Sequence, residues 1–391
     1  MGSIKRFRIL PVFLLTLVML CLLPFGTAAV GEGETSGGGE VNITEQIEAS
    51  GANDLLDQLP DGVEEQLGAS GIEGIDPESI LQFDIGDFFG SLWRTVKSEL
   101  TKPLAIFLTL AAIILLCALL NAFHSTMEEN AVSKVFSTVA VLCVCGAVIL
   151  PIADCITRAA GLIRDCSTFI LGFIPVFTGI MTVSGKPISG AAYSTVLFGV
   201  IQVISQIAST TLVPLLSIFL AFCLVGSVGD MIKLDGVSST VRTTVLWILG
   251  FMLTIFIGIL SMQGLVANSA DTVTMKTSKF LIGSFVPVVG GAVSEALNSI
   301  QGCLGLIRST VGAFGIIVCL LTFLPIIINI VLLMLSLNFA AMLAGVFGVT
   351  RVQGLLKSAS TALSLLLGII IFFAMLLIVA TTVMLVLGLG I

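Results

Sequence analysis

Histidine and charge are both scarce in this chain. It has a single histidine, His124, and only 10% of its residues are charged, whereas a soluble domain carries about 25%. A catalytic triad or a metal site built on histidine therefore has no material. Residues 101–391 hold twelve basic and eight acidic residues, and the 42 residues between Arg308 and Arg351 hold none. Such a distribution excludes an ordinary soluble domain for this region.

The sequence also lacks the pattern of a disulfide-linked domain and the motif of a phosphate-binding loop. None of the nine cysteines lies in residues 30–100, and most fall inside apolar runs, where cysteine behaves as a small hydrophobic residue. The sequence GIMTVSGKP at 179–187 superficially resembles a phosphate-binding loop. Its glycines are one residue too far apart, and Pro187 replaces the Ser or Thr that would reach magnesium. We therefore expect no enzymatic activity, no metal and no other cofactor.

Long apolar runs occupy most of residues 101–391. A bilayer core is about 30 Å thick, and roughly 20 apolar helical residues cross it. Lipid offers no water to an open backbone, so the runs predict an all-α, polytopic membrane protein with eight or nine spans. The run 311–349 is either one long helix or a tight hairpin near Pro325. The expected spans are 103–123, 135–153, 166–183, 190–208, 211–228, 243–262, 311–349 and 361–388.

The first 29 residues are typical of a signal peptide. Three basic residues precede an apolar stretch of about 15 residues, and small residues follow at 27–29. The alternative is an uncleaved N-terminal anchor. In either case we expect the segment that follows to lie outside the cytoplasm. The Lys and Arg residues of the later loops do not settle the orientation by themselves.

Residues 30–100 form an acidic region, with sixteen Asp and Glu against two basic residues. This charge argues against a nucleic-acid partner, which requires a basic surface. Residues 30–75 are rich in Gly, Glu and Asp, so we expect them to be largely disordered, with one short amphipathic helix around Leu55 to Leu67. A firmer amphipathic helix is expected at 76–100, capped by Asp76. It lies on the membrane surface, packs on a partner, or folds back on the membrane domain.

Polar residues inside the apolar runs are candidate pathway positions. Gln202, Ser205, Gln206 and Ser209 share one face of the expected span 190–208. The face either lines an aqueous path or forms hydrogen bonds between helices.

Charged and amide residues mark further positions. Asp154 with Arg158, and the pair 164–165, sit at a membrane interface or in a proton relay. Asn329 and Asn338 mark a helix break or a lining. The residues Ala340, Ala344 and Gly348 form a ridge typical of close helix packing.

The interval 261–300 is the most distinctive part of the sequence. Asn268, Asp271, Lys276 and Lys279 precede an apolar stretch of ten residues, which is too short to span a bilayer. Two breaking residues, Pro287 and Gly290, follow it. The pattern predicts a broken or re-entrant segment at 280–291, which survives at membrane depth only when protein or a cavity surrounds it. The alternative is an interfacial elbow between two spans.

The run SMQGLVANSADTVTMKTSKFLIGSFVPVVGGAVSEA, within the same interval, resembles the central segment of the stage III sporulation protein AE family. The resemblance covers roughly residues 80–391. It implies a multi-pass protein of the mother-cell membrane around the forespore. It also implies partners among the other stage III sporulation proteins, including a cytoplasmic secretion-type ATPase that would act through loops such as 229–242. A homo-oligomer is a further expectation.

Three functions remain open from the sequence. We expect the membrane core of a secretion-like channel that links mother cell and forespore, serving as an export gate or permease-like platform. One alternative is a self-sufficient secondary transporter of a small solute, which would require ionisable residues deep in spans, and few occur. The other is a purely structural membrane scaffold of the complex.

Overall fold

The computed structural model describes most of the chain between residues 52 and 389. The expected signal peptide and the start of the acidic region, residues 1–51, lie outside the described residues. The other stretches outside them are 61, 70–71, 73, 76–84, 125–129, 208–209, 211–212, 229–234, 286–289 and 390–391.

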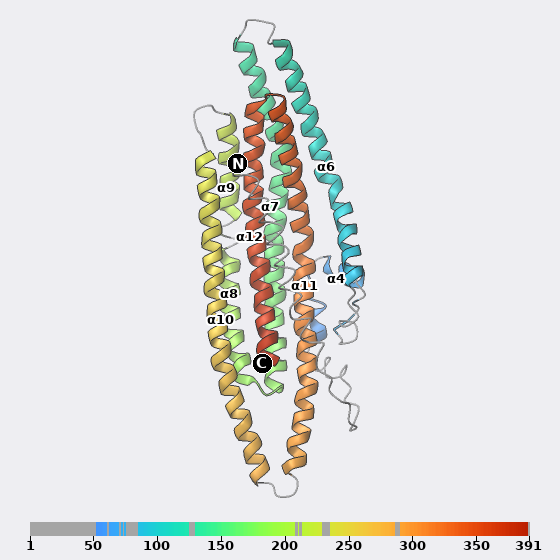
Figure 1. The fold of residues 1–391 in the computed structure, drawn as a ribbon, viewed down its shortest axis with the longest axis vertical. Coiled ribbons are helices and arrows are strands. Elements are labelled where there is room, and N and C mark those ends of the chain that lie inside the picture. Colours follow the sequence, from blue (N-terminus) through green and yellow to red (C-terminus); the bar gives the residue numbers. More distant parts are fainter. Residues whose placement is uncertain are drawn as a thin grey trace.

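Long helices run side by side along one axis of the molecule (Figure 1). They are α6 (Ile85–His124), α7 (Asn130–Val183), α8 (Pro187–Ile207), α9 (Val213–Val228), α10 (Asp235–Phe285), α11 (Gly290–Val346) and α12 (Thr350–Leu389). The described part of the chain contains no β-strand, so the all-α prediction is confirmed. The helix α12 packs against α7, α9, α10 and α11, while α6 packs against α7 and α11.

Six of these helices are long and apolar enough to cross a bilayer. Their apolar segments are Leu92–Leu119, Thr138–Val183, Pro187–Ile207, Thr240–Ser278, Leu304–Val346 and Thr350–Val383. A helix rises 1.5 Å per residue, so the 54 residues of α7 extend about 80 Å. Because the bilayer core is about 30 Å thick, α7, α10 and α11 each reach well beyond it.

The structure does not confirm eight or nine separate spans. The expected spans 135–153 and 166–183 are two parts of α7, because the residues between them stay helical. Asp154 and Arg158 form an ion pair of 2.9 Å one helical turn apart, which suits a continuous helix. The run 311–349 lies largely in one helix that passes through Pro325, so the hairpin alternative is wrong. The 16 residues of α9 are fewer than a full crossing needs.

The expected break at 280–291 falls between two long helices. Residues 280–285 continue α10 and do not form a short separate element. Gly290 begins α11, and Pro287 lies outside the described residues. The ends of α10 and α11 that flank this break extend below the other helices (Figure 1). The break itself falls on residues outside those described, so the broken segment and the elbow both stay predictions.

The N-terminal segment of residues 52–75 packs against the helical bundle. The 3₁₀ helix η1 (Ala52–Leu55) contacts α7, and α4 (Val63–Ala69) contacts α11. Leu55 and Leu67 are buried in the main hydrophobic core. The amphipathic helix expected around Leu55 to Leu67 is instead two short helices, because Pro60 and Gly62, whose φ is 78°, interrupt it.

The helix expected at 76–100 is helical from Ile85 onward. It continues through Pro103 into the first apolar segment as the single helix α6. Exposed residues change in character along it: Arg94, Lys97 and Lys102 are exposed before the proline, and leucines such as Leu104 and Leu108 are exposed after it. The exposed basic residues of α6 thus end at Lys102, just before Pro103.

Candidate functional site

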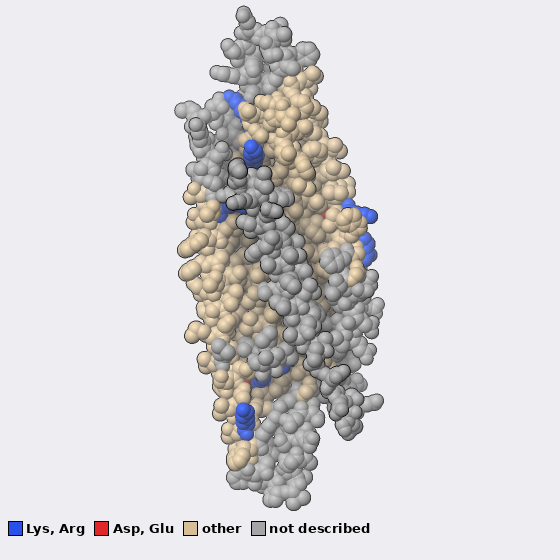
Figure 2. Space-filling view, viewed as in Figure 1, with Lys and Arg blue, Asp and Glu red and all other residues tan. Residues whose placement is uncertain are grey.

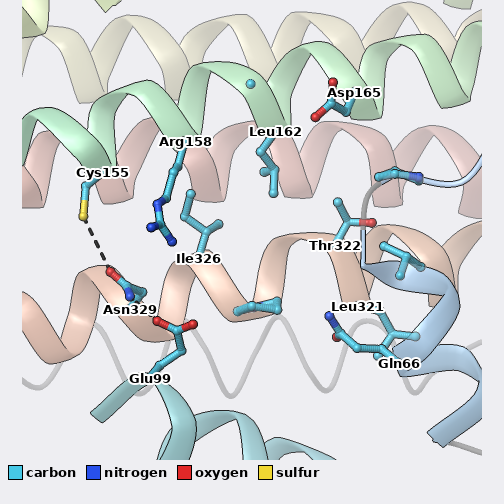
Figure 3. Close-up of a pocket in the computed structure, with 14 residues that line it drawn as sticks. Gln66, Glu99, Cys155, Arg158, Leu162, Asp165, Leu321, Thr322, Ile326 and Asn329 are labelled. Atoms are coloured by element: carbon cyan, nitrogen blue, oxygen red, sulfur yellow. Dashed lines mark hydrogen bonds between the residues drawn. The ribbon is translucent and has the colours of Figure 1, made fainter. Parts of the chain in front are cut away.

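A cavity of about 490 Å³ lies near the middle of α7 and α11, where α6 and α4 also approach (Figure 3). Its wall combines apolar residues such as Leu162 and Ile326 with polar side chains from four elements. The polar lining residues are Gln66, Glu99, Cys155, Arg158, Asp165, Thr322 and Asn329. Polar groups inside an apolar bundle are costly, so their convergence on one cavity indicates a site.

Asn329 links α7 to α6 across the edge of this cavity. The Cys155 thiol donates to Asn329 Oδ1 over 3.6 Å, and Asn329 Nδ2 donates to the carboxylate of Glu99 (Figure 3). The amide thus uses its acceptor on one helix and its donor on another, which fixes the side chain. Asn329 lines this cavity and the helix does not break there, while a role for Asn329 in lining a pathway stays a prediction.

Three charged side chains border the cavity: Glu99, Arg158 and Asp165. Arg158 pairs with Asp154, and both side chains are about half exposed. Within the described part of the chain, no ion pair reaches Glu99 or Asp165, although both line the cavity. The cavity wall thus carries two carboxylates and one guanidinium beside apolar side chains.

A second polar site lies at the turn between α7 and α8. Gly185 has a φ of 83°, and the N–H of Lys186 donates to the carbonyl of Met181 over 2.9 Å. This is the glycine-centred stop of a helix, and Pro187 at the first position of α8 suits the restart. The sequence Ser-Gly-Lys-Pro, which resembled a phosphate loop, therefore forms a tight turn between two helices.

Asp271 on α10 caps the start of α8. One carboxylate oxygen accepts the N–H of Ile188 at 3.0 Å, and the other accepts the N–H of Ser189 at 2.7 Å. The first N–H groups of a helix have no partner inside the helix, and its N-terminus favours negative charge. Asp271 is only 1% exposed, so this long-range cap holds α10 against α8.

Lys186 and Asn268 lie beside this cap. Lys186 Nζ donates a hydrogen bond to Asn268 Oδ1 over 3.2 Å. Burial of the half-buried side chain, helped by the positive charge of Arg308 and opposed by Asp271, lowers the pKa of Lys186 to about 8. The structure thus brings together two of the predicted residues, Asn268 and Asp271, and adds Lys186 and Arg308 to them.

The other predicted residues lie apart from both sites. Gln202 and Gln206 are exposed on α8, and Lys276 is exposed on α10. The side chain of Lys279 lies outside the described residues. No role in a pathway is tested for these positions, so each remains a prediction.

Sequence reasoning missed Glu99, Cys155 and Arg308. Glu99 was counted with the acidic region, and Cys155 was one cysteine among nine. Arg308 carried a signal, since it is the last charge before the long uncharged run. The sequence alone does not show which helices lie next to one another.

Comparison with known proteins places the chain in a family. A sequence model of the family described as stage III sporulation protein AE matches residues 77–388. The chain belongs to the stage III sporulation protein AE family. The stage III sporulation protein AE of Bacillus subtilis (strain 168) is 25% identical over 217 residues, which are 55% of this chain and 54% of that protein. The match thus spans about half the length of the curated relative. No solved structure matches the chain.

The family and the apolar helices together indicate the general class of this protein. The chain is a sporulation protein of the stage III AE family, and its six apolar helices make it a multi-pass membrane protein. This family is not a known enzyme family. Exposed apolar side chains lie on α6, α9 and α10, and Figure 2 shows few charged side chains on the described surface in view, which suits a membrane environment.

Proposed function

We propose that this chain is the membrane core of a secretion-like channel between mother cell and forespore, acting as an export gate or permease-like platform after engulfment. The observation that carries the proposal is the polar cavity among apolar helices. Glu99, Arg158 and Asp165 border this cavity in an otherwise apolar bundle, an arrangement that suits a polar path. The cavity supplies a polar stretch of a path through the bundle.

The proposal extends to the location and the partners of the chain. It places the protein in the mother-cell membrane around the forespore, with the N-terminal region outside the cytoplasm. Its partners are other stage III sporulation proteins, including a cytoplasmic ATPase of the secretion type, and it assembles as one copy or as a homo-oligomer. The loop 229–242 remains the proposed ATPase contact, and residues 229–234 of it lie outside the described residues.

Two glycines of α7 provide a matched test of the cavity. Gly161 lines the cavity and Gly179 does not, and a Cβ atom added at either position meets no other atom within 4 Å. We expect Gly161→Phe to fill the cavity and to abolish late forespore gene expression, measured with a reporter after engulfment. Gly179→Phe adds the same side chain elsewhere and should leave the reporter active.

Both variants must reach the wild-type level in the membrane for the comparison to hold. If Gly161→Phe supports normal late expression while deletion of the gene abolishes it, the chain is required but the cavity is not part of a path. A scaffold role would then replace the channel role. Solute uptake by the purified chain alone in liposomes would instead favour the secondary transporter.

A further inference from the structure

The helix α6 has one packed side and one outward side. It lies at the edge of the bundle, where it packs against α7 and α11 (Figure 1). Its packed side carries Pro103, Leu110 and Ile114, which are buried. The outward side carries exposed residues at helical spacing from Trp93 to Leu119. The helix therefore presents one continuous outward face, whose chemistry can be followed along its axis.

The first part of this outward face is basic and aromatic. Arg94, Lys97 and Lys102 are exposed, and Trp93 is 61% exposed. Lys97 Nζ lies 5.7 Å from the centroid of the Trp93 ring, which is a cation–π contact. Figure 2 shows basic side chains at the edge of the molecule where the first part of α6 lies in Figure 1. We call these four residues the basic band.

The acidic residue within the same stretch points to the other side of the helix. Between residues 93 and 102, Glu99 is the one acidic residue of the sequence. Its carboxylate accepts a hydrogen bond from Asn329 Nδ2 of α11, and it lines the central cavity. The outward face of this stretch is therefore positively charged.

The outward face becomes apolar directly after the basic band. Leu104, Leu108, Leu115 and Leu119 are between 48% and 59% exposed. They belong to an apolar segment that is long enough to cross a bilayer. Counted from Pro103, roughly 20 helical residues cover the thickness of a bilayer core, about 30 Å. The order of residues on this face is that of a helix that enters a bilayer at Pro103.

We propose that the basic band binds the headgroups of anionic phospholipids, at the surface of the bilayer that α6 enters. Lys and Arg are attracted to the negative charge of such a surface, and their long apolar stems can remain beside hydrocarbon. Tryptophan favours the same level of a membrane, because its ring is apolar with one polar edge. The positive charge and the apolar face that continues from it both favour a lipid surface over a protein partner. The band then fixes the depth of α6 in the bilayer.

The full-length chain reconstituted in lipid vesicles tests this assignment at Trp93. The chain has two tryptophans, so Trp247→Phe leaves Trp93 as the only one and keeps an aromatic ring beside Phe251. The vesicles contain phosphatidylcholine and phosphatidylglycerol in equal amounts, and one of the two lipids carries a quenching nitroxide next to its headgroup. We expect labelled phosphatidylglycerol to quench Trp93 fluorescence more strongly than labelled phosphatidylcholine. A nitroxide at the end of the acyl chain should quench Trp93 least.

Two lysines of the basic band provide the variant. Lys97→Gln combined with Lys102→Gln should weaken the preference for phosphatidylglycerol around Trp93 at least about fivefold, since each basic residue near an anionic surface strengthens the attraction about fivefold. Both lipids are compared within each variant, so a change in the fluorescence of Trp93 itself cancels. Lys276→Gln combined with Lys357→Gln is the matched control, because these exposed lysines lie on α10 and α12. The control should keep the preference of the parent chain.

The proposal is overturned if the two labelled lipids quench Trp93 equally in the parent chain. It is equally overturned if Lys97→Gln with Lys102→Gln keeps the preference that the control shows. Quenching of Trp93 by iodide from the water, with no quenching by any labelled lipid, would also overturn it, because the band would then lie away from the bilayer. The measurement uses this chain alone, so its outcome is independent of the channel proposal.

Discussion

The carboxylate of Asp271 accepts the backbone N–H of Ser189 over 2.7 Å, across 82 positions of the chain. The same carboxylate accepts the N–H of Ile188, so one buried side chain of α10 closes the N-terminus of α8. Helix caps usually come from the residue just before the helix. Here that region is the tight turn at Gly185, whose residues are occupied in ending α7. The cap therefore comes from a neighbouring helix and joins the two.

Removal of this cap should destabilise the bundle. Asp271→Ala leaves two N–H groups without acceptors and removes two charge-assisted hydrogen bonds, a loss of about 2–3 kcal/mol. Asp154→Ala is the control, because its ion pair with Arg158 is exposed and is worth at most about 1 kcal/mol. Thermal unfolding in detergent, followed by circular dichroism, compares them. An equal loss of thermal stability in the two variants would show that the cap contributes no more than the exposed ion pair does.

The segment of residues 52–69 should protect the central cavity. Leu55 and Leu67 are buried against the bundle, and Gln66 of the same segment lines the cavity wall. Leu55→Glu combined with Leu67→Glu should release the segment, because a buried carboxylate without a partner is costly. Cys155, which is 4% exposed, should then react several-fold faster with a water-soluble thiol reagent.

Residue-resolved mass spectrometry would measure this labelling at Cys155. Glu64→Gln is the control, since Glu64 is an exposed residue of the same helix α4 and its change leaves the packing intact. An unchanged rate at Cys155 in the double variant would mean that the segment does not cover the cavity.

Local patterns in the sequence predicted the type of structure but not the pairing of its helices. Apolar runs predicted an all-α membrane protein, and Asn268 and Asp271 were recognised as unusual. The pairing of Glu99 with Asn329 spans 230 positions. Periodicity shows which face of a helix is polar, but not which helix it meets. The number of spans was overestimated around Asp154 and Arg158, because charges that suggest a loop can also pair one turn apart within a continuous helix.

Stability should depend on pH through Lys186. Its pKa is about 8 in the folded chain against 10.5 for the free side chain, so the unfolded state binds more protons between these values. Stability should therefore rise as pH increases from about 8 towards 10. The gain is about 1 kcal/mol, less than the full shift implies, because solvent screens the half-exposed side chain.

Arg308, Asp271 and Asn268 are among the groups that act on Lys186. Lys186→Gln should lose this rise, whereas Lys276→Gln should keep it because Lys276 is exposed. Melting temperatures in detergent at pH 7, 8, 9 and 10 give the comparison. A wild type whose stability falls throughout this range, in parallel with Lys186→Gln, would contradict the expected sign.

The last prediction from the sequence concerns a role in sporulation for two lysines of α10. Lys276 is exposed on the part of α10 that follows Asp271, and Lys279 lies one turn further on. Lys276 is exposed, and an exposed charge contributes little to stability. We expect Lys276→Ala with Lys279→Ala to leave the protein level unchanged. If these side chains contact a partner of the channel, the double variant should lower the spore yield. Arg164→Ala, an exposed change on α7, serves as the control, and a normal spore yield from the double variant would remove the case for a contact there.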